Sequence, residues 1–389
     1  MPVLDDTIAE RLERLLQDFP PKATDRTAFL GARFDAGLAW VHYPEGCGGS
    51  GADVAQHRVV EQRLAEVGAP SPFPGNPIGI GMVGPTIVHH GTDDQRARYL
   101  RRLWSGEDVW CQLFSEPSAG SDLASLATRA VRDGNEWVID GQKVWTSLGD
   151  KARHGLLLAR TDIDAPKNHG ITAFLVDMRA PGVDVRPLRQ MTGDAEFSEV
   201  FLQEVRLHAD AQLGPEGKGW QVATTTLMNE RVSIGNALAS SGTGPAATAI
   251  DLYRQRHTGD AALRDRVTRL WIESELTRMM SLRAAQLGRA GNPGPVGSAG
   301  KLLGAEHARR IHDLLVDLLG AEGMLYPERN ADGSPAARTP QVTFLRSRAN
   351  TIEGGTSEVM RNILAERILG LPRDDHGPKD RPWREIPRN

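Results

Sequence analysis

The sequence predicts an α+β fold in which a helical domain is followed by a β-domain and then by a second helical domain. In the first part, apolar residues recur at helical spacing, beginning with Ile8, Leu12, Leu15, Leu16 and Phe19. From about residue 110 to residue 214 the apolar period falls to two, and turn residues separate several short runs. Beyond Gly217 the helical spacing returns and persists almost to the end of the sequence.

The first helical domain is expected over residues 1–110. Its clearest helix follows Thr92, because this residue can cap the N-terminus and two acidic residues come directly after it. Turn-rich stretches at residues 43–51 and 68–85 separate the helices of this domain.

The β-domain is expected over residues 111–214, where many short strands with turn signals between them indicate a small sandwich or barrel. The dipeptide Asp140-Gly141, inside the segment 133–147, predicts a hairpin turn. Further strands are predicted at residues 154–160, 170–177, 183–187 and 198–205.

The second helical domain is expected over residues 215–389. Loops are predicted at residues 289–297 and 332–339, and the polar tail after Pro372 is expected to be poorly ordered. The predicted helices cover residues 220–240, 244–257, 261–288, 298–320 and 356–369.

Composition excludes several classes of protein. The 389 residues suggest about two or three domains, and the formal net charge of -4 without a basic run argues against nucleic-acid binding. Cys47 and Cys111 lie far apart, so neither a disulfide framework nor a cysteine metal site is expected. No apolar run predicts a membrane span, and the acidic N-terminus does not resemble a secretory signal. We therefore predict a cytoplasmic enzyme.

The segment Gln112–Ala130, QLFSEPSAGSDLASLATRA, contains the most informative motif. Its glycine, proline and small hydroxyl residues free backbone N–H groups to face an anion or a cofactor. The segment 133–147, DGNEWVIDGQKVWTS, follows it closely. This pair, in this order and at this distance, resembles the flavin-binding region of the acyl-CoA dehydrogenase family. The resemblance covers nearly the whole chain and is strongest over residues 91–231 and 348–370.

This resemblance, to an actinobacterial-type member, implies a helical N-terminal domain, a middle β-barrel or sandwich and a C-terminal four-helix bundle. It also implies FAD as the cofactor. Trp145 would pack on the flavin ring, and Thr146 and Ser147 would hydrogen-bond its edge. The residues that match the family's other flavin or phosphate contacts are Gln112, Phe114, Ser115, Gly120 and Ser121, of which Ser121 is also a candidate substrate contact.

A second cofactor contact is implied at the last predicted helix. Two glycines of the loop Glu353–Thr356 precede this helix and leave N–H groups free for a phosphate. Thr356 either caps the helix or contacts the cofactor, because the family residues that match Thr356 and Glu358 lie near FAD. Two segments, residues 253–265 and 317–323, depart from the family pattern that binds the AMP half of FAD across a subunit interface.

The chemistry implied by the family needs one carboxylate to remove the proton α to a thioester carbonyl. A desolvated carboxylate suits this task, because burial raises its pKa toward working pH. Most members place this base immediately before Gly-Thr at the last helix, but Gly354 occupies that position here and is left as a substrate contact. A minority place it before an arginine in an earlier bundle helix, which corresponds to Glu230.

Two glutamates therefore compete for the role of base. Glu230 is favoured because it lies on a helical stripe with apolar neighbours, where a carboxylate needs a partner or a function. Glu353 is the rival, since the adjacent glycines could let it swing into place. Arg231 is expected to support the site or to bind the CoA moiety. The stripe comprises Ala223, Leu227, Glu230, Ile234 and Leu238.

Other chemistry-bearing residues are interpreted as structural. His89, His90 and His307 are expected to be satisfied histidines, and no cluster has the spacing of metal ligands. No Gly-x-Ser-x-Gly elbow or phosphate-binding Walker loop is present.

The resemblance therefore predicts FAD-dependent desaturation of an acyl-CoA to a trans-2-enoyl-CoA, with an electron-transfer flavoprotein as the acceptor. Some members of this subgroup handle steroid or branched acyl-CoAs. An acyl-CoA oxidase or flavin monooxygenase of the same fold is one alternative, and a non-catalytic subunit of a heteromeric enzyme is another. The family also implies a homotetramer or an α2β2 assembly.

Overall fold

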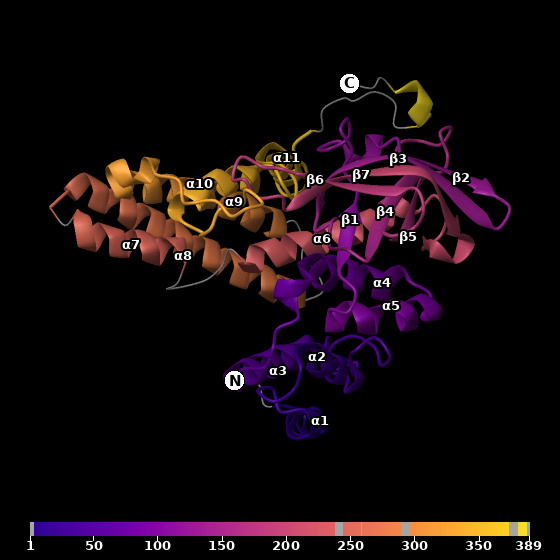
Figure 1. Cartoon of the computed structure of the whole chain (residues 1–389), viewed down its shortest axis with the longest axis horizontal. Coiled ribbons are helices and arrows are strands. Elements are labelled where there is room, and N and C mark those ends of the chain that lie inside the picture. The colour runs from indigo at the N-terminus through magenta and orange to yellow at the C-terminus, as the bar shows by residue number, and fades with distance from the viewer. Residues whose placement is uncertain (1–3, 238–243, 258, 290–295, 373–379, 387–389) are drawn as a thin grey trace. The chain divides into compact units, whose positions relative to one another are not determined.

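The structure, a computed structural model, describes residues 4–237, 244–257, 259–289, 296–372 and 380–386 (Figure 1). The chain divides into two compact units. Unit 1 comprises Met1–Leu188, Phe197–Thr226 and Pro378–Asn389, and unit 2 comprises Arg189–Glu196 and Leu227–Gly377. Each unit encloses its own cluster of buried apolar side chains.

Helices make up the first part of unit 1, as predicted. At α1, α2 and α3 an aspartate precedes the helix and its carboxylate accepts backbone N–H bonds from the first turn. Thr92 forms a reciprocal capping box with Gln95, which confirms the predicted start of α5. These helices are α1 (Asp6–Asp18), α2 (Arg26–Asp35), α3 (Val54–Glu66), α4 (Gly84–His90) and α5 (Asp93–Ser105).

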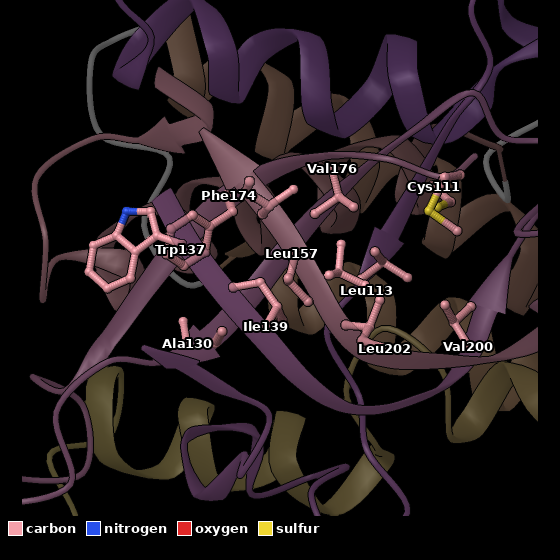
Figure 2. Close-up of a cluster of buried hydrophobic side chains, with 14 of the residues drawn as sticks. Cys111, Leu113, Ala130, Trp137, Ile139, Leu157, Phe174, Val176, Val200 and Leu202 are labelled. Atoms are coloured by element: carbon pink, nitrogen blue, oxygen red, sulfur yellow. The ribbon is translucent and has the colours of Figure 1, made fainter. Parts of the chain in front are cut away.

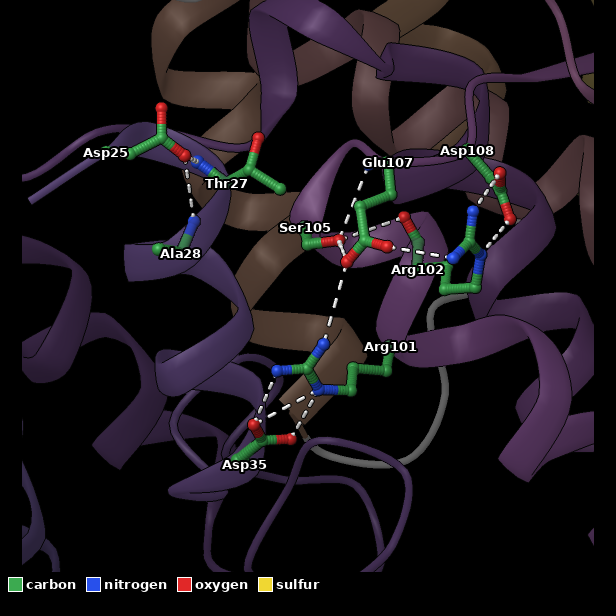
Figure 3. A network of polar contacts seen from close by, with 9 residues as sticks. All are labelled: Asp25, Thr27, Ala28, Asp35, Arg101, Arg102, Ser105, Glu107 and Asp108. Atoms are coloured by element: carbon green, nitrogen blue, oxygen red, sulfur yellow. Dashed lines mark hydrogen bonds and ion pairs between the residues drawn. The ribbon is translucent and has the colours of Figure 1, made fainter.

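Charged side chains of α5 connect the helices to the first strand (Figure 3). Arg101 donates from Nε and Nη2 to the two carboxylate oxygens of Asp35 at the end of α2, both at 2.8 Å. Arg102 binds both carboxylate oxygens of the buried Asp108, at 2.7 and 3.0 Å. Two-point pairs of this kind define an orientation as well as a distance. They set the direction in which the chain leaves α5 and enters β1 at Trp110.

One mixed sheet forms the middle of unit 1. Its strand order is β6-β7-β3-β2-β4-β5-β8, and β1 pairs with β4 in parallel. All four strands predicted after residue 150 are present with ends within three residues of the expected ones. The strands are β1 (Trp110–Leu113), β2 (Arg129–Asp133), β3 (Glu136–Ser147), β4 (His154–Arg160), β5 (Ile171–Asp177), β6 (Val183–Leu188), β7 (Phe197–His208) and β8 (Gln212–Leu213).

A cluster of buried side chains from the strands forms part of the core of unit 1 (Figure 2). The rings of Trp137 and Phe174 meet edge to face with centroids 5.4 Å apart, a favourable aromatic geometry. Cys111 is fully buried in the same cluster, and burial raises the pKa of its thiol. Cys111 therefore belongs to the core, as the sequence predicted, and each large apolar side chain buried beside it contributes roughly 1.5–3 kcal/mol.

The predicted hairpin at Asp140-Gly141 is wrong. Strand β3 runs without a break from Glu136 to Ser147, and the turn lies earlier, at Gly134, whose φ of 61° is left-handed. The sequence contains a second Asp-Gly dipeptide at this earlier position, and that one makes the turn. Gly141 instead allows a close approach, because a Cβ there would lie 2.4 Å from the hydroxyl oxygen of Thr128.

Helices of unit 2 pack around α9. A buried cluster from α7, α8 and α9 includes Ala249, Leu270 and Leu314. The short helix α10 was not predicted; it begins at Pro340, directly after the predicted loop at residues 332–339. The helices are α6 (Gly219–Ala237), which begins in unit 1, α7 (Pro245–Arg256), α8 (Ala261–Arg289), α9 (Val296–Leu319), α10 (Pro340–Ser347) and α11 (Ser357–Arg367). Most of the predicted loop 289–297 lies outside the described residues.

Part of the predicted polar tail departs from its prediction. Residues 380–386 are not poorly ordered: they belong to unit 1, and the Trp383 side chain is only 6% exposed. The rest of the predicted tail, residues 373–379 and 387–389, lies outside the described residues. Among the helices that the structure describes, none has the length and apolar character needed to cross a membrane.

Candidate active site

The predicted flavin loop, residues 112–121, begins in the last two residues of strand β1. Gln112 is half-buried and Phe114 is buried, so the strand is anchored before the loop opens. Ser115 follows, and its carbonyl accepts a bond of 2.9 Å from the backbone N–H of Val144 on β3. Farther along, Gly120 and Ser121 are exposed, and a Cβ built on Gly120 would meet nothing within 4 Å. The tip of the loop is therefore exposed, with free space beside Gly120, whereas the backbone at the start of the loop is anchored.

A buried ion pair beneath the flavin loop ties the loop to the segment that follows it. Lys143 of β3 is fully buried, and its ammonium donates to Glu116 Oε1 at 2.8 Å and to the carbonyl of Phe114 at 3.0 Å. The Glu116 carboxylate also accepts the N–H groups of Ala127 and Thr128, at 2.7 and 2.9 Å. The first half of the loop and residues 127 and 128 beyond its end are thus tied to one carboxylate.

The electrostatics of this pair follow from its burial. Burial alone would raise the pKa of Glu116, but the Lys143 ammonium and the donated hydrogen bonds outweigh it and lower the pKa. The glutamate is therefore a fixed anion at neutral pH. Sequence reasoning missed this pair, although a signal existed: Trp137, Ile139 and Lys143 follow the buried face of one strand.

Trp145 is presented by an irregularity in β3. Lys143 pairs with Val200 and Thr146 with Ser198, so β3 has one residue more than β7 between these pairs. Trp145 lies in this bulge with a left-handed φ of 59°, and it is 61% exposed. Holding a bulky residue in this conformation costs on the order of 1–3 kcal/mol, and strain of this kind gathers at functional sites.

The residues after Trp145 lie where a ligand edge could be bound. Thr146 is buried, and among the described residues its hydroxyl has no hydrogen-bond partner. Ser147 is half-buried opposite Phe197 of β7. An unsatisfied buried hydroxyl typically costs about 1–3 kcal/mol, which a bound ligand would recover. The exposed indole ring of Trp145 lies beside the Thr146 hydroxyl, which lacks a partner among the described residues. This pair fits a flavin, which needs a flat apolar surface against its ring and polar groups at the ring's edge.

In unit 2, two glycines and a buried lysine shape the loop before α11. Gly354 and Gly355 have left-handed φ values of 65° and 92°, and a Cβ on Gly355 would lie 2.6 Å from the end of Met360. Lys301 of α9 is buried and donates to the carbonyls of Asn350 and Gly355 at 3.1 and 2.5 Å. The hydrogen bonds of Lys301 therefore hold the backbone of this loop in place. The sequence contained no local signal that this lysine would do so.

Thr356 is the N-cap of α11. Its hydroxyl accepts a bond of 3.2 Å from the N–H of Val359, which is one of the two roles predicted for it. Glu358 lies in the first turn and is largely exposed. The contact of either residue with a cofactor stays a prediction.

Glu353, one of the two candidate bases, is held by a guanidinium. Arg346 of α10 donates to both carboxylate oxygens of Glu353, at 3.2 and 3.1 Å, and to Glu196 at 2.8 Å. A two-point pair of this kind resists displacement. Glu353 would have to leave Arg346 before it could reach a substrate, although the glycines beside it allow the backbone to change.

Glu230, the other candidate base, lies on α6 and is half-buried. The helix buries Val222, Ala223 and Thr226 in the turns before it. The side chains of Ile234 and Leu238, the last two members of the predicted stripe, and of the separate candidate Arg231 lie outside the described residues. The apolar stripe therefore stays a prediction beyond Glu230.

The histidines interpreted as structural have ordinary partners. His90 Nε2 lies 2.9 Å from the hydroxyl of Thr225, and His307 Nδ1 lies 3.3 Å from Glu273. His89 contacts the ring of His90 edge to face. Within the described ranges, no group of three or more acidic, histidine or cysteine side chains could hold a metal ion.

Comparison with known proteins identifies the family. Three family models match the chain in order: the acyl-CoA dehydrogenase N-terminal domain at residues 4–107, the middle domain at 111–205 and the C-terminal domain at 217–369. Their limits lie near the predicted boundaries at 110 and 214, which stay predictions.

Two relatives from Mycobacterium tuberculosis extend this match. Acyl-CoA dehydrogenase IpdE1 is 39% identical, over 88% of this chain and 87% of its own length. Acyl-CoA dehydrogenase FadE34 is 40% identical over 87% of this chain, but the matched region spans only 45% of that longer protein.

A solved structure has the same fold. The protein described as "Tcur3481-Tcur3483 steroid ACAD" matches with a TM-score of 0.75 and 28% identity, over 94% of this chain and 97% of that chain. Members of the family are FAD flavoproteins and oxidoreductases, and the residues around Trp145 fit that cofactor. The chain belongs to the acyl-CoA dehydrogenase family, and its cofactor is FAD.

Proposed function

We propose that this chain desaturates an acyl-CoA thioester between its α and β carbons and yields the trans-2-enoyl-CoA. The observation that carries the proposal is the strained and exposed Trp145, next to a loop that a buried ion pair anchors. Membership of the acyl-CoA dehydrogenase family supports it independently. The chemistry of FAD, when bound, is to accept the hydride that leaves the β carbon.

Glu230 is the proposed base that takes the α proton. Its half-buried position on α6 suits a carboxylate whose basicity depends on partial desolvation. Glu353 is the weaker candidate, because it lies one residue before the position that most family members give the base; Arg346 binds both of its carboxylate oxygens. Arg231, Ser121 and Gly354 are the proposed substrate contacts, with Arg231 directed at the CoA moiety.

The cofactor contacts are proposed for two segments. Gln112, Phe114, Ser115, Gly120 and Ser121 would contact the flavin or its phosphates, and Trp145, Thr146 and Ser147 would border the ring. Thr356 and Glu358 would lie near FAD at the start of α11, where unpaired helical N–H groups favour a phosphate.

We propose a bulky thioester, steroid or branched, as the substrate, because the structural relative described as a steroid ACAD covers almost the whole chain. An electron-transfer flavoprotein is the proposed electron acceptor. A cytoplasmic location stays a prediction.

A homotetramer or an α2β2 assembly is proposed for the native state. Helix α8 supports association, because its large apolar side chains are 45% to 54% exposed in the single chain. Single exposed apolar residues are ordinary, but a row along one helix marks an interaction surface. The row comprises Trp271, Ile272, Leu276, Met279 and Leu282.

The second candidate function is a non-catalytic subunit of a heteromeric enzyme. Two observations favour it: Gly354 occupies the usual position of the base, and Glu353 beside it is bound to Arg346. The name of the steroid relative, which joins Tcur3481 and Tcur3483, is also consistent with an enzyme built from two different chains.

An anaerobic titration of the purified chain with a panel of acyl-CoAs tests the proposal. We expect bound flavin whose visible absorption bleaches with one substrate class and recovers slowly in air. Rapid recovery in air would indicate an oxidase instead. Absence of flavin from the chain purified alone, with flavin restored by a second chain, would favour the heteromeric subunit.

A further inference from the structure

Residues 380–386 contact the connection between β4 and β5 in unit 1. The N–H of Trp383 donates to the carbonyl of Ala165 at 3.0 Å, and the N–H of Arg384 donates to Ile163 at 3.1 Å. Pro382 forms an isolated bridge with Pro166. Because these are backbone bonds, they fix the segment's position and do not merely cover a surface.

Trp383 lies over a buried guanidinium. The guanidinium carbon of Arg160, on strand β4, is 4.7 Å from the centre of the Trp383 ring. Both side chains are nearly inaccessible to solvent. A cation stacked on an aromatic face gains most when both groups are desolvated, so this contact is strong for its class.

The same guanidinium braces the segment that follows the flavin loop. Arg160 Nη2 donates to the carbonyls of Ala124 and Leu126 at 2.6 and 3.3 Å, and Nη1 donates to Lys167 at 2.7 Å. The backbone N–H of Arg160 also binds Thr128 at 2.6 Å. Three of these four bonds join Arg160 to the chain that leaves the flavin loop, and the bond to the Lys167 carbonyl joins it to the connection between β4 and β5.

A further ion pair stabilises the segment 122–128, which follows the flavin loop. Lys167 binds the carboxylate of Asp122, the residue directly after Ser121, and Ser125 donates to that carboxylate at 2.6 Å. The loop residues proposed to contact FAD are therefore continuous with a segment braced by Arg160 and Lys167. Without an aromatic cover, Arg160 would be exposed to water that competes for the carbonyls it now binds.

We infer that residues 380–386 form a C-terminal clamp: Trp383 covers Arg160, and Arg160 positions the segment 122–128 so that the loop retains FAD. Trp383 and Arg160 are positioning residues, since Arg160 contacts the backbone of Ala124 and Leu126, and Trp383 acts through Arg160. The clamp rests on the proposed cofactor role of Gly120 and Ser121, but its mechanical part does not depend on FAD.

Hydrogen exchange of the full chain without FAD tests the mechanical part. The reporters are the amides of Ser125 and Leu126, which donate to the carbonyls of Asp122 and Leu123 at 3.0 and 3.1 Å. In Trp383→Ala, and in a chain ended after Lys379, we expect these amides to exchange about tenfold faster. Trp383→Phe should restore most of the protection, because a ring again covers the guanidinium.

Arg384→Ala is the matched control from the same segment. It removes an exposed ion pair with Asp164 at 2.7 Å, which contributes little, and leaves Trp383 in place. Exchange in the segment 122–128 should stay within twofold of the unaltered chain. Equal exchange in Trp383→Ala and the unaltered chain would overturn the clamp, and so would acceleration spread evenly over unit 1.

The rate of FAD release then tests the functional part. Release from the loaded Trp383→Ala variant should be about tenfold faster than from the unaltered chain, with Trp383→Phe between them. Faster exchange with unchanged FAD release would overturn the link to the cofactor. If the unaltered chain bound no FAD, the proposed cofactor site would fail while the exchange result still decided whether the clamp exists.

Discussion

Replacing Lys143 with Met should destabilise unit 1 strongly. The substitution keeps the shape and the apolar stem, but it removes the ammonium from Glu116, which is 6% exposed, and from the carbonyl of Phe114. Breaking a buried pair by removing one partner costs about 3–5 kcal/mol, because the remaining charge stays buried. We therefore expect a loss of that size in the free energy of unfolding at pH 7.5.

The pH dependence of this loss carries a definite sign. In the unaltered chain the folded pKa of Glu116 is lowered, so its stabilising effect is present above the unfolded pKa and is lost as pH falls through the folded pKa. In Lys143→Met the buried carboxylate lacks its cation, and burial raises the folded pKa above the unfolded value. Protonation then favours folding, so the variant should recover part of its deficit between pH 7.5 and pH 5.5.

Tryptophan fluorescence during urea unfolding measures these free energies, because every tryptophan except Trp271 lies in unit 1. Lys151→Met is the matched control, since Lys151 is exposed, and its stability should change by less than about 0.5 kcal/mol. A deficit below about 1 kcal/mol for Lys143→Met, or a deficit independent of pH, would refute the reasoning.

Two further substitutions test the backbone of the site. Trp145→Gly should relieve the left-handed strain at φ 59° and leave the chain without FAD as stable or about 1 kcal/mol more stable, while FAD affinity falls more than tenfold. Thermal unfolding and a flavin titration measure the two effects, and a loss of stability without FAD would contradict the strain. Gly355→Ala should destabilise unit 2 by about 1–3 kcal/mol, because its φ is 92° and the new Cβ would lie 2.6 Å from Met360. Helical circular dichroism during unfolding measures this cost, and an unchanged midpoint would contradict it.

Much of the fold could be predicted from local pattern. The strands after residue 150 and the long helices have strong periodicity, and the structure contains them near their predicted limits. The hairpin was misplaced because two Asp-Gly dipeptides lie in one segment, at Gly134 and Gly141, and local preference does not rank them. Helix α10 and the clamp were missed because proline and polar residues signal loops, whereas tertiary contacts order both segments.

The candidate site shows a similar division. The residues that border the proposed flavin came from a motif, but the side chains that hold the motif in place did not. Lys143 and Glu116 are 27 positions apart, and Lys301 and Gly355 are 54 apart, so no local pattern connects them. A lysine is also usually expected at the surface, and only a specific acceptor explains its burial.

The most direct test of the account is the anaerobic flavin spectrum of three chains with one bleaching acyl-CoA. The unaltered chain, Glu230→Gln and Glu353→Gln should all bind FAD, because neither substitution changes the flavin loop, β3 or the two glycines before α11. We expect bleaching to be lost, by at least about a thousandfold in rate, only in Glu230→Gln, since the α proton then has no acceptor. Bleaching that survives in Glu230→Gln and disappears in Glu353→Gln would contradict the account and move the base to the loop before α11.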